Sequence, residues 1–405
     1  MLQRIWICGV VLAGCSGGKV DPDAGCEPDC EETAPTDDTG ATEDTTEPAD
    51  DTDPGSSQDD TASGDTAPPE DTDLPSYYNS DTGEVSCDSV TFTGLDGAVV
   101  DYTAAFTDGT EIELEDAGTL SFCPGEWFVR LTVKEADVDI VGLGETRDET
   151  VISAGELGTV LSFRGPGQTI NLSNLVVERG AALGSGNRSS GGGLRCTDDT
   201  NINIQDVTFT RNRAYDGAAI YAAETCHVAI YDTLFADNDT VDDGAGVRID
   251  GGSAEVYDST FSGNTARDGA AAFTIYGDMS FENCIFEDNW ASYYGGAMVN
   301  YYGTIEVRDS TFIDHSASIS GGVFFTIGDL TLENVTLDTS TAREAAIYTY
   351  GSYGAVEGVD VTFIDSDPAD IYVYATGGGP GGGGGAYDFE PNASFTCDNL
   401  GCETH

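Results

Sequence analysis

The stretch "YDSTFSGN", residues 257–264, has close counterparts before and after it in the chain. "YDTLFADN" (231–238) precedes it, and "ENCIFEDN" (282–289) and "RDSTFIDH" (308–315) follow it. Each copy places an Asn or Asp three residues before a Phe, and three of the four place an Asn three residues after it. The copies are 25 or 26 residues apart, a constant spacing that indicates a repeat architecture.

The repeat extends through eight copies once the Phe position is aligned. That column reads Val177, Phe209, Phe235, Phe261, Phe286, Phe312, Leu337 and Phe363. An Asn or Asp in the same place of every copy indicates a tight corner with a left-handed backbone, which these residue types tolerate best after Gly. The corner column comprises Asn174, Asp206, Asp232, Asp258, Asn283, Asp309, Asn334 and Asp360.

Within each copy, apolar and polar residues alternate with period two, as in "AEVYD" (254–258) and "LTLEN" (330–334). Short strands at this spacing stack on the equivalent strands of neighbouring copies, about 4.8 Å apart. We therefore predict an all-β fold, a single-stranded parallel β-helix (a solenoid) with 25–26 residues per rung. The Phe and the residue that follows the corner are expected to face inward.

The first 84 residues differ in composition from the repeats. Arg4 and the apolar run Ile5–Ala13 indicate a signal peptide over residues 1–14, because the run is too short to span a bilayer. Residues 15–84 are rich in Asp, Thr, Pro, Gly and Glu and poor in large apolar side chains. This composition predicts a disordered, self-repelling acidic tether. The tether is a solvated stalk or, through its many Asp, a weak calcium binder.

The solenoid and its two caps account for the rest of the chain. Stacked strands are predicted over residues 136–376, with an N-terminal cap and the entry to the helix over residues 85–135. A Gly-rich segment and a C-terminal cap are predicted over residues 377–405. Caps are expected because an uncovered solenoid end would pair with other chains.

The charge of the chain bears on its partners. The 73 Asp and Glu against 15 Lys and Arg give a net charge of −58, which repels nucleic acid at long range and argues against it as a partner. Asp206, Asp232 and Asp258 follow one another along the corner column, so cations are expected to bind there weakly and calcium is a possible ligand. No other cofactor and no specific metal site are predicted.

Two motifs resemble those of a known group of surface proteins. "FTRN", "FADN", "FSGN" and "FEDN", followed by "DGAAI", "DGAGV", "DGAAA" or "YGGAM", resemble the FxxN and GGA[ILV] repeats of chlamydial polymorphic outer-membrane proteins. They also resemble the repeats of bacterial surface proteins with a pectin-lyase-like fold. The resemblance covers about residues 120–375 and implies a right-handed parallel β-helix. The FxxN motif is lost in the last three repeats, which read "FIDH", "LDTS" and "FIDS".

The stretch "LAGC", residues 12–15, resembles the lipobox of bacterial lipoproteins. By that resemblance, Cys15 becomes the lipidated mature N-terminus, and Ser16 after it favours sorting to the outer membrane. We therefore expect a protein that is held at the outer membrane, on the cell surface, by a lipid anchor. An ordinary signal peptide with an incidental Cys is the alternative.

The cysteines fit an exported protein in an oxidising setting. Cys284 lies in the inward column after the corner and is predicted to be a buried free thiol. Cys196 and Cys226 come from adjacent repeats, but their positions within the repeat differ by four, so a bridge and two separate thiols both remain open. Disulfides are predicted between Cys26 and Cys30, Cys87 and Cys123, and Cys397 and Cys402.

The strand after the "DGA" motif carries the candidate catalytic residues. Enzymes with a pectin-lyase-like fold, by the resemblance, act on acidic polysaccharides with the outer face of this strand. Arg248 and Asp250 are the one outward Arg–carboxylate pair that a lyase could use, and Arg195 lies in the same outward column. A hydrolase would need paired carboxylates. A surface polysaccharide lyase or glycoside hydrolase is therefore one of two candidate functions.

Aromatic residues gather on the same outward face. They are expected to form an exposed stripe that binds a glycan or a surface protein, or to stack along the solenoid for stability alone. The first candidate function is accordingly non-enzymatic: a lipid-anchored surface protein with a role in adhesion or in the envelope structure. The predicted binding stripe comprises Tyr221, Phe273, Tyr276, Tyr301, Tyr302, Phe325, Tyr348 and Tyr350.

Overall fold

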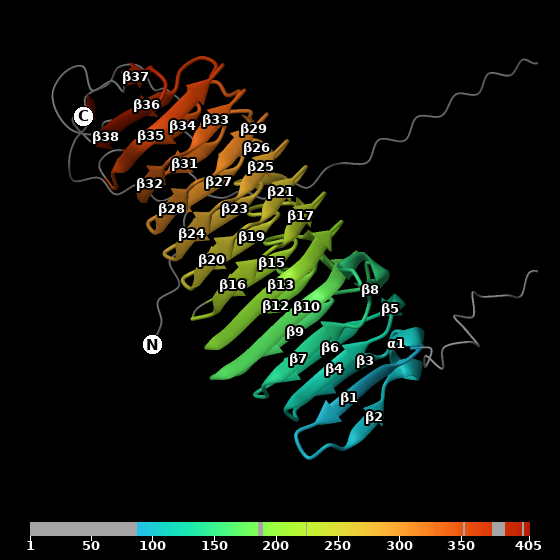
Figure 1. Cartoon of the computed structure of the whole chain (residues 1–405). Coiled ribbons are helices and arrows are strands. Elements are labelled where there is room, and N and C mark those ends of the chain that lie inside the picture. Colours follow the sequence, from blue (N-terminus) through green and yellow to red (C-terminus); the bar gives the residue numbers. More distant parts are fainter. Residues whose placement is uncertain (1–86, 185–188, 224, 351–352, 375–384, 399–400) are drawn as a thin grey trace, which may run out of the picture. The chain divides into compact units, whose positions relative to one another are not determined.

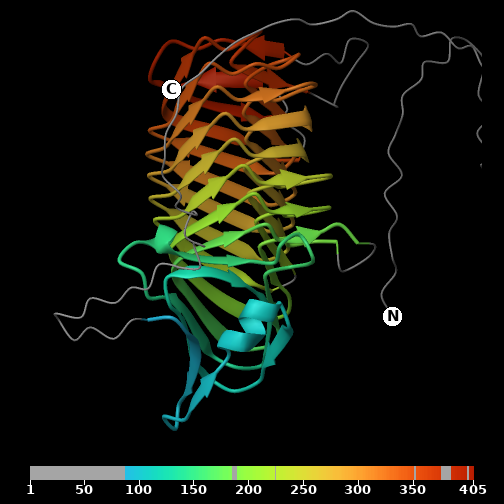
Figure 2. The same cartoon turned by 90° about the vertical axis from the view of Figure 1, so that its right-hand side faces the viewer.

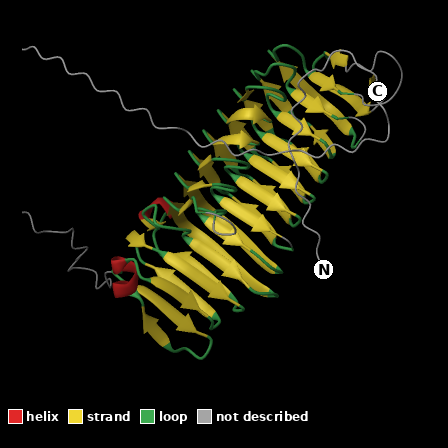
Figure 3. Cartoon of the chain, turned by 180° about the vertical axis from the view of Figure 1, so that it is seen from behind, coloured by secondary structure: helices red, strands yellow, loops and turns green. Residues whose placement is uncertain are grey.

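Strands dominate the part of the chain that the computed structural model describes (Figure 3). The helices of this part are short: α1 (Thr103–Asp108) and η1 (Arg147–Glu149). No helix within it is long and apolar enough to cross a membrane. The signal-peptide and tether segments, with Cys15, Cys26 and Cys30, lie outside it. The described residues are 87–184, 189–223, 225–350, 353–374, 385–398 and 401–405.

The described strands form three sheets, in which equivalent strands of successive repeats stack on one another (Figure 1). Sheet A has 21 strands: β1 (Val90–Gly94), β2 (Val99–Asp101), β4 (Gly118–Phe122), β5 (Gly125–Phe128), β7 (Val138–Gly142), β8 (Thr150–Ser153), β10 (Gln168–Glu178), β13 (Thr200–Thr210), β16 (His227–Tyr231), β17 (Leu234–Ala236), β20 (Ser253–Tyr257), β21 (Thr260–Ser262), β24 (Asp278–Glu282), β25 (Ile285–Glu287), β28 (Thr304–Arg308), β29 (Thr311–Ile313), β32 (Asp329–Glu333), β33 (Thr336–Asp338), β35 (Val356–Ile364), β38 (Ala393–Asp398) and β39 (Gly401–Thr404). Sheet B has 12 strands: β3 (Glu111–Leu114), β6 (Arg130–Lys134), β9 (Leu161–Arg164), β12 (Leu194–Cys196), β15 (Ile220–Ala223), β19 (Val247–Asp250), β23 (Ala272–Ile275), β27 (Met298–Tyr301), β31 (Phe324–Thr326), β34 (Ile347–Thr349), β36 (Ile371–Val373) and β37 (Gly385–Tyr387). Sheet C has six strands: β11 (Ala181–Ala182), β14 (Arg213–Ala214), β18 (Asp239–Thr240), β22 (Thr265–Asp268), β26 (Trp290–Tyr294) and β30 (Ser316–Ala317).

One repeat shows how a rung is built. The chain runs through β20 and β21 of sheet A, then β22 of sheet C and β23 of sheet B, before β24 starts the next rung. Four left-handed residues mark the bends of this rung: Asp258 (φ 50°), Gly263 (φ 64°), Gly269 (φ 61°) and Tyr276 (φ 57°). The next rung pairs in parallel register with it, so that Val256 lies beside Phe281 and Phe261 beside Phe286. The predicted all-β parallel β-helix is confirmed.

The corner column adopts the predicted left-handed backbone. All eight of its residues have φ between 47° and 56°. Its amides also relieve the charge of its carboxylates, since Asn283 Nδ2 donates to Asp258 Oδ1 and Asn334 Nδ2 donates to Asp309 Oδ1, the latter at 2.6 Å. The corner column therefore has a structural role: it sets the corner of each rung, and two pairs of its side chains bond along the solenoid.

The Phe column fills the interior of the solenoid. Phe261 is fully buried, and its ring stacks on Phe235 at 4.5 Å and on Phe286 at 4.9 Å between centroids. Cys284, in the inward column, is a buried free thiol as predicted, and burial raises its pKa to about 12. Identical rings at one position per rung give the core a continuous apolar stack.

The Asn of the FxxN motif forms a second, wholly buried ladder. Asn238 Nδ2 donates to Phe209 O and to Asn264 Oδ1, both at 3.0 Å. Asn264 repeats this pattern with Phe235 O and Asn289 Oδ1. These amides donate hydrogen bonds to backbone carbonyl oxygens that would otherwise be unpaired in the core. Each unpaired group there would cost about 1–3 kcal/mol of stability.

His315 takes the place of this Asn in the "FIDH" repeat. Its Nδ1 accepts the backbone N–H of Asn289 at 3.2 Å, so the network assigns the ring proton to Nε2. Nε2 is buried and has no partner among the described residues. Burial lowers the pKa of His315 to about 4, even though backbone contacts with Asn289 and Phe286 act in the opposite direction.

Antiparallel strands close both described ends of the sheets. At the N-terminal end, β1 pairs antiparallel with β2 and β4. Helix α1, whose Phe106 is buried, lies at the same end (Figure 2). At the other end, β38 pairs antiparallel with β35 and β39, and β37 with β36. The predicted bridges Cys87–Cys123 and Cys397–Cys402 are confirmed, and Cys196–Cys226, left open by the sequence, is also a disulfide.

We expect His315→Asn to stabilise the protein. An Asn here would keep the acceptor for Asn289 N–H and add a donor for Phe286 O, which should raise the free energy of unfolding by about 1 kcal/mol at pH 8. The pKa of His315 is lower in the folded state (about 4) than its ordinary value of 6.5. The wild type therefore loses stability as the pH falls from about 6.5 to about 4, and the variant should lose less.

Urea unfolding of both proteins between pH 4 and pH 8 measures this difference. His227→Asn, a change at an exposed His, is the control and should follow the wild type. A destabilised His315→Asn variant would show that the imidazole packing outweighs the missing hydrogen bond.

Candidate functional site

The outer face of sheet B carries the outward column that the sequence indicated. In register along the sheet, Arg195 pairs with Tyr221, Tyr221 with Arg248, and Arg248 with Phe273. The column continues through Val299, Phe325 and Tyr348. Its first half is polar and its second half aromatic, and the two halves behave differently.

The aromatic half is buried, which corrects the prediction of an exposed stripe. Phe273, Phe325 and Tyr348 are at most 6% exposed and form a second apolar cluster with Val299. Tyr294, at the end of β26, stacks on Phe325 with 4.4 Å between ring centroids. Tyr294, which precedes β27 in the chain, thus covers part of the outer face of the sheet. Tyr301 and Tyr350 pack against this cluster and are only partly buried.

Tyrosines at the bend after sheet B remain exposed. Tyr276 is 66% exposed and Tyr302 is 48% exposed, and their rings stack at 5.4 Å between centroids. Tyr353, which the sequence analysis did not single out, is 62% exposed and meets Tyr302 edge to face. We call these three residues the tyrosine corner. Of the predicted binding stripe, only Tyr276 and Tyr302 belong to it.

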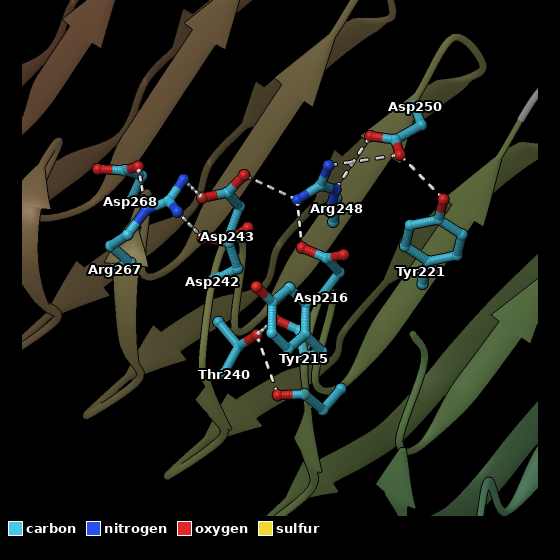
Figure 4. Close-up of polar contacts among 11 residues, drawn as sticks. Tyr215, Asp216, Tyr221, Thr240, Asp242, Asp243, Arg248, Asp250, Arg267 and Asp268 are labelled. Atoms are coloured by element: carbon cyan, nitrogen blue, oxygen red, sulfur yellow. Dashed lines mark hydrogen bonds and ion pairs between the residues drawn. The ribbon is translucent and has the colours of Figure 1, made fainter. Parts of the chain in front are cut away.

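The polar half of the column centres on Arg248 (Figure 4). Its guanidinium bonds Asp250 through Nε at 3.0 Å, and Asp216 and Asp243 through Nη1 at 2.5 Å and 2.8 Å. Tyr221 Oη donates to Asp250 at 2.9 Å. The Arg248 side chain is only 12% exposed, and its guanidinium also lies 4.8 Å from the centroid of the Phe273 ring. The predicted Arg248–Asp250 pair exists, but it is part of a larger network.

Arg267 extends the network into the next rung. It bonds Asp243 through Nη2 at 3.0 Å and Asp268 through Nε at 2.9 Å, and its Nη1 contacts Asp242. Asp216, Asp243 and Asp268 each precede the left-handed Gly of a "DGA" motif, at Gly217, Gly244 and Gly269. These aspartates are not among the residues predicted from the sequence, although the Asp-Gly pair recurs in three successive repeats. We call the five aspartates and two arginines the aspartate–arginine cluster.

Burial and mutual repulsion govern the titration of this cluster. Burial raises the pKa of Asp243 to about 8, and Asp242 adds to this effect while Arg248 and Arg267 oppose it. Burial also raises the pKa values of Asp216 and Asp268. Burial alone would lower the pKa of Arg248, but Asp250, Asp243 and Asp216 outweigh it and raise that pKa. Because the pKa of Asp243 is raised to about 8, the cluster holds a proton on its carboxylates near neutral pH.

The same carboxylates have partial metal-ligand geometry. In the described part of the chain, Asp216, Asp242 and Asp243 each bring one oxygen within 4.8 Å of the others. Arg248 and Arg267 already bond these groups. A divalent cation would have to displace the guanidiniums, so the arrangement favours a protein-supplied positive charge.

The corner column borders an open groove of about 630 Å³ on sheet A. Arg147 of η1 enters it, lying 3.2 Å from Asp206 Oδ1 and donating to Asp232 O at 2.6 Å. The guanidinium of Arg147 therefore supplies part of the positive charge that bound cations were predicted to supply at this column. Weak calcium binding along this column stays a prediction.

Arg195, the remaining catalytic candidate, stands apart from the cluster. It lies one rung before Tyr221 and is partly buried. No hydrogen bond or ion pair joins it to another described residue. The structure therefore brings Arg248 and Asp250 together and leaves Arg195 outside their network.

Comparison with known proteins bears on the fold. A family model described as "Right handed beta helix region" matches residues 192–367. The fold is a right-handed parallel β-helix. No curated protein sequence matches the chain.

Three solved structures show low similarity to the chain. YbhC of Escherichia coli has 13% identity and a TM-score of 0.28, over 58% of this chain and 67% of its own. A pectin methylesterase from Yersinia enterocolitica has 14% identity and a TM-score of 0.26, over 65% and 90%. PfbA, a surface adhesin of Streptococcus pneumoniae, has 11% identity and a TM-score of 0.27, over 73% and 90%. At these values, the similarities carry no information about what this chain binds or catalyses.

We expect Asp243→Asn to flatten the pH dependence of stability. The pKa of Asp243 is higher in the folded state (about 8) than its ordinary value of 3.8. The folded wild type therefore holds the extra proton, and this contribution to stability is lost as the pH rises from about 4 to about 8. Asn cannot ionise, so the Tm of the variant should decline less over that range, and the variant should gain on the wild type at pH 8.

Calorimetric Tm profiles of both proteins measure this effect. Asp239→Asn, which removes an exposed partner of Arg213, is the control and should run parallel to the wild type. Parallel profiles for Asp243→Asn would mean that the two arginines keep Asp243 ionised throughout.

Proposed function

We propose that this protein is a lipid-anchored cell-surface β-helix that binds a partner without catalysing a reaction. The proposal rests on one observation: the charged groups of the aspartate–arginine cluster are already bonded to one another. Arg248 bonds three carboxylates and is nearly buried. A lyase needs a basic group that reaches the substrate, and a guanidinium held in this way neither reaches a substrate nor abstracts a proton.

The exposed aromatic surface supports a binding role. Among the described residues, Tyr276, Tyr302 and Tyr353 form an exposed aromatic group at bends that follow sheet B, with one further rung between Tyr302 and Tyr353. Such side chains supply apolar area and a hydroxyl at low entropic cost, as binding surfaces require. A glycan or a protein on a neighbouring surface fits this chemistry.

The alternative function, a surface polysaccharide lyase or glycoside hydrolase, has one observation in its favour. Raised carboxyl pKa values often mark catalytic acids, and the pKa of Asp243 is raised to about 8. Structural ion-pair networks raise pKa values as well, and the Asp243 side chain is only 8% exposed. We therefore assign the raised pKa to the structural network.

One experiment separates the two functions. The full chain is incubated with a glycan array, and with acidic and neutral polysaccharides in reducing-sugar and unsaturated-product assays. We expect no turnover, and binding that falls at least about tenfold in Tyr276→Ala/Tyr302→Ala. Tyr231→Ala/Tyr257→Ala removes a similar stacked pair on sheet A and is the control. Turnover that is lost in Asp243→Asn would replace this proposal with the enzymatic one.

The lipid anchor has its own test. Cys15→Ser removes the thiol that would be lipidated, so the protein should move from the membrane fraction to the soluble fraction. Ser16→Ala is the control and should stay with the membranes. Unchanged fractionation of Cys15→Ser would remove the anchor from the proposal and leave the binding role untouched.

A further inference from the structure

Three arginines of the described chain form no ion pair: Arg164, Arg195 and Arg343. This is unexpected in a protein with 73 acidic and 15 basic residues. Arg343 is exposed to water and lies in a different part of the solenoid. Arg164 and Arg195 lie on adjacent strands of sheet B, and Arg195 is partly buried.

The two arginines share one face of the sheet. In the parallel register of β9 and β12, Arg195 lies beside Ser162, and Arg164 is two residues further along β9. Because side chains alternate along a strand, Ser162, Arg164 and Arg195 all project from the same face. Arg164 Nε donates to Ser162 Oγ at 3.2 Å. Nε of Arg195 is buried and has no hydrogen-bond partner in the described chain.

The residues in register with Arg164 and Arg195 on the two flanking strands already have bonding partners. Lys134, the register partner of Arg164, forms an ion pair with Glu113. Tyr221, the register partner of Arg195, donates to Asp250, which bonds Arg248 in the next rung. The carboxylate of Asp250 is therefore engaged by Tyr221 and Arg248 and forms no ion pair with Arg195. The carboxylate of Asp198, near the end of β9, accepts the backbone N–H of Gly165 at 3.1 Å and forms no ion pair with Arg164.

An unpaired guanidinium in this position is costly. Burial lowers the pKa of Arg195, and repulsion from Arg164 lowers it further. Arginine nevertheless stays charged in proteins, so it does not escape the cost by losing its proton. A counter-anion from outside the chain would remove the cost.

We propose that Arg164, Arg195 and the hydroxyl of Ser162 bind the phosphate group of a ligand. Guanidinium groups match phosphate oxygens with paired N–H donors, and two of them balance the charge of a phosphate dianion. A single carboxylate would leave one positive charge uncompensated. The acidic field of the rest of the chain opposes a long-range approach of anions, so binding depends on these short contacts.

This inference goes beyond the proposed function, because it assigns a second binding site and the chemical group that this site recognises. It does not depend on the tyrosine corner or on the lipid anchor. Loss of phosphate binding would leave the turnover and glycan-array results unchanged, so the two proposals fail separately.

Thermal unfolding of the full chain at constant ionic strength tests the site. Increasing concentrations of inorganic phosphate replace sodium chloride, and sodium acetate serves as the monoanion comparison. We expect a saturable Tm rise of about 3 °C with phosphate and none with acetate. Arg164→Gln, a change at an exposed position, should weaken the apparent affinity at least about tenfold. Arg343→Gln is the control and should respond like the wild type.

Arg195→Gln distinguishes a binding role from a packing role. If Arg195 is an uncompensated charge awaiting an anion, this variant melts at the wild-type temperature or higher without phosphate, and phosphate has no effect on it. A lower Tm without phosphate, together with an unchanged phosphate response, would overturn the proposal. The absence of a saturable response in the wild type, or an equal response to acetate, would also overturn it.

Two further probes identify the source of the phosphate group. Glucose 6-phosphate represents a phosphorylated sugar, and phosphatidylcholine vesicles with and without phosphatidic acid represent a lipid headgroup. Arg164-dependent binding of either probe supports the site and assigns its source. Binding of neither probe, with a full response to inorganic phosphate, would contradict a phosphate carried on a larger ligand.

Discussion

Parallel stacking in register is the constraint on which the rest of this structure depends. Each residue lies about 4.8 Å from its equivalents in the rungs before and after it, so any choice of side chain is repeated against itself. Apolar rings gain from this repetition, as in the Phe column of the core. Amides gain too, because an Asn both donates and accepts, as in the buried Asn ladder.

Charges cannot be repeated in this way without compensation. Asp216, Asp243 and Asp268 occupy one column, and Arg248 and Arg267 are placed between them. Arg147 does the same for Asp206 at the corner. Arg164 and Arg195 differ from these three arginines, because neither forms an ion pair with a described carboxylate. Their positive charge is therefore available to a ligand.

Features that recur once per rung could be predicted from the sequence. The left-handed corner at Asp258, the inward ring of Phe261 and the buried thiol of Cys284 follow from position within the repeat. The burial of Phe273 and Phe325 could not, because it depends on contacts with side chains at other positions of the repeat. Tyr301 meets Phe273 edge to face, and Tyr294 stacks on Phe325.

Only part of the aspartate–arginine cluster could be predicted from the sequence, for a related reason. Arg248 and Asp250 are two residues apart on one strand, and the period-two pattern places them on one face. Asp216 and Arg267 come from the rungs before and after, at different positions of the repeat, and meet only once the strands have stacked. Residues of one column can be identified from the spacing of the repeat. Contacts between different columns can be identified only from the three-dimensional structure.

The Cys196–Cys226 bridge adds a covalent link to a structure that is otherwise held together by contacts between neighbours. In such a linear array, loss of order passes from one rung to the next. Cys196 follows Arg195 on β12, and Cys226 lies just before β16, in the rung that carries Asp216 and Tyr221. Fraying that begins at either end therefore cannot separate these two rungs. The anion-binding face and the first aspartate of the cluster remain side by side for as long as the bridge is intact.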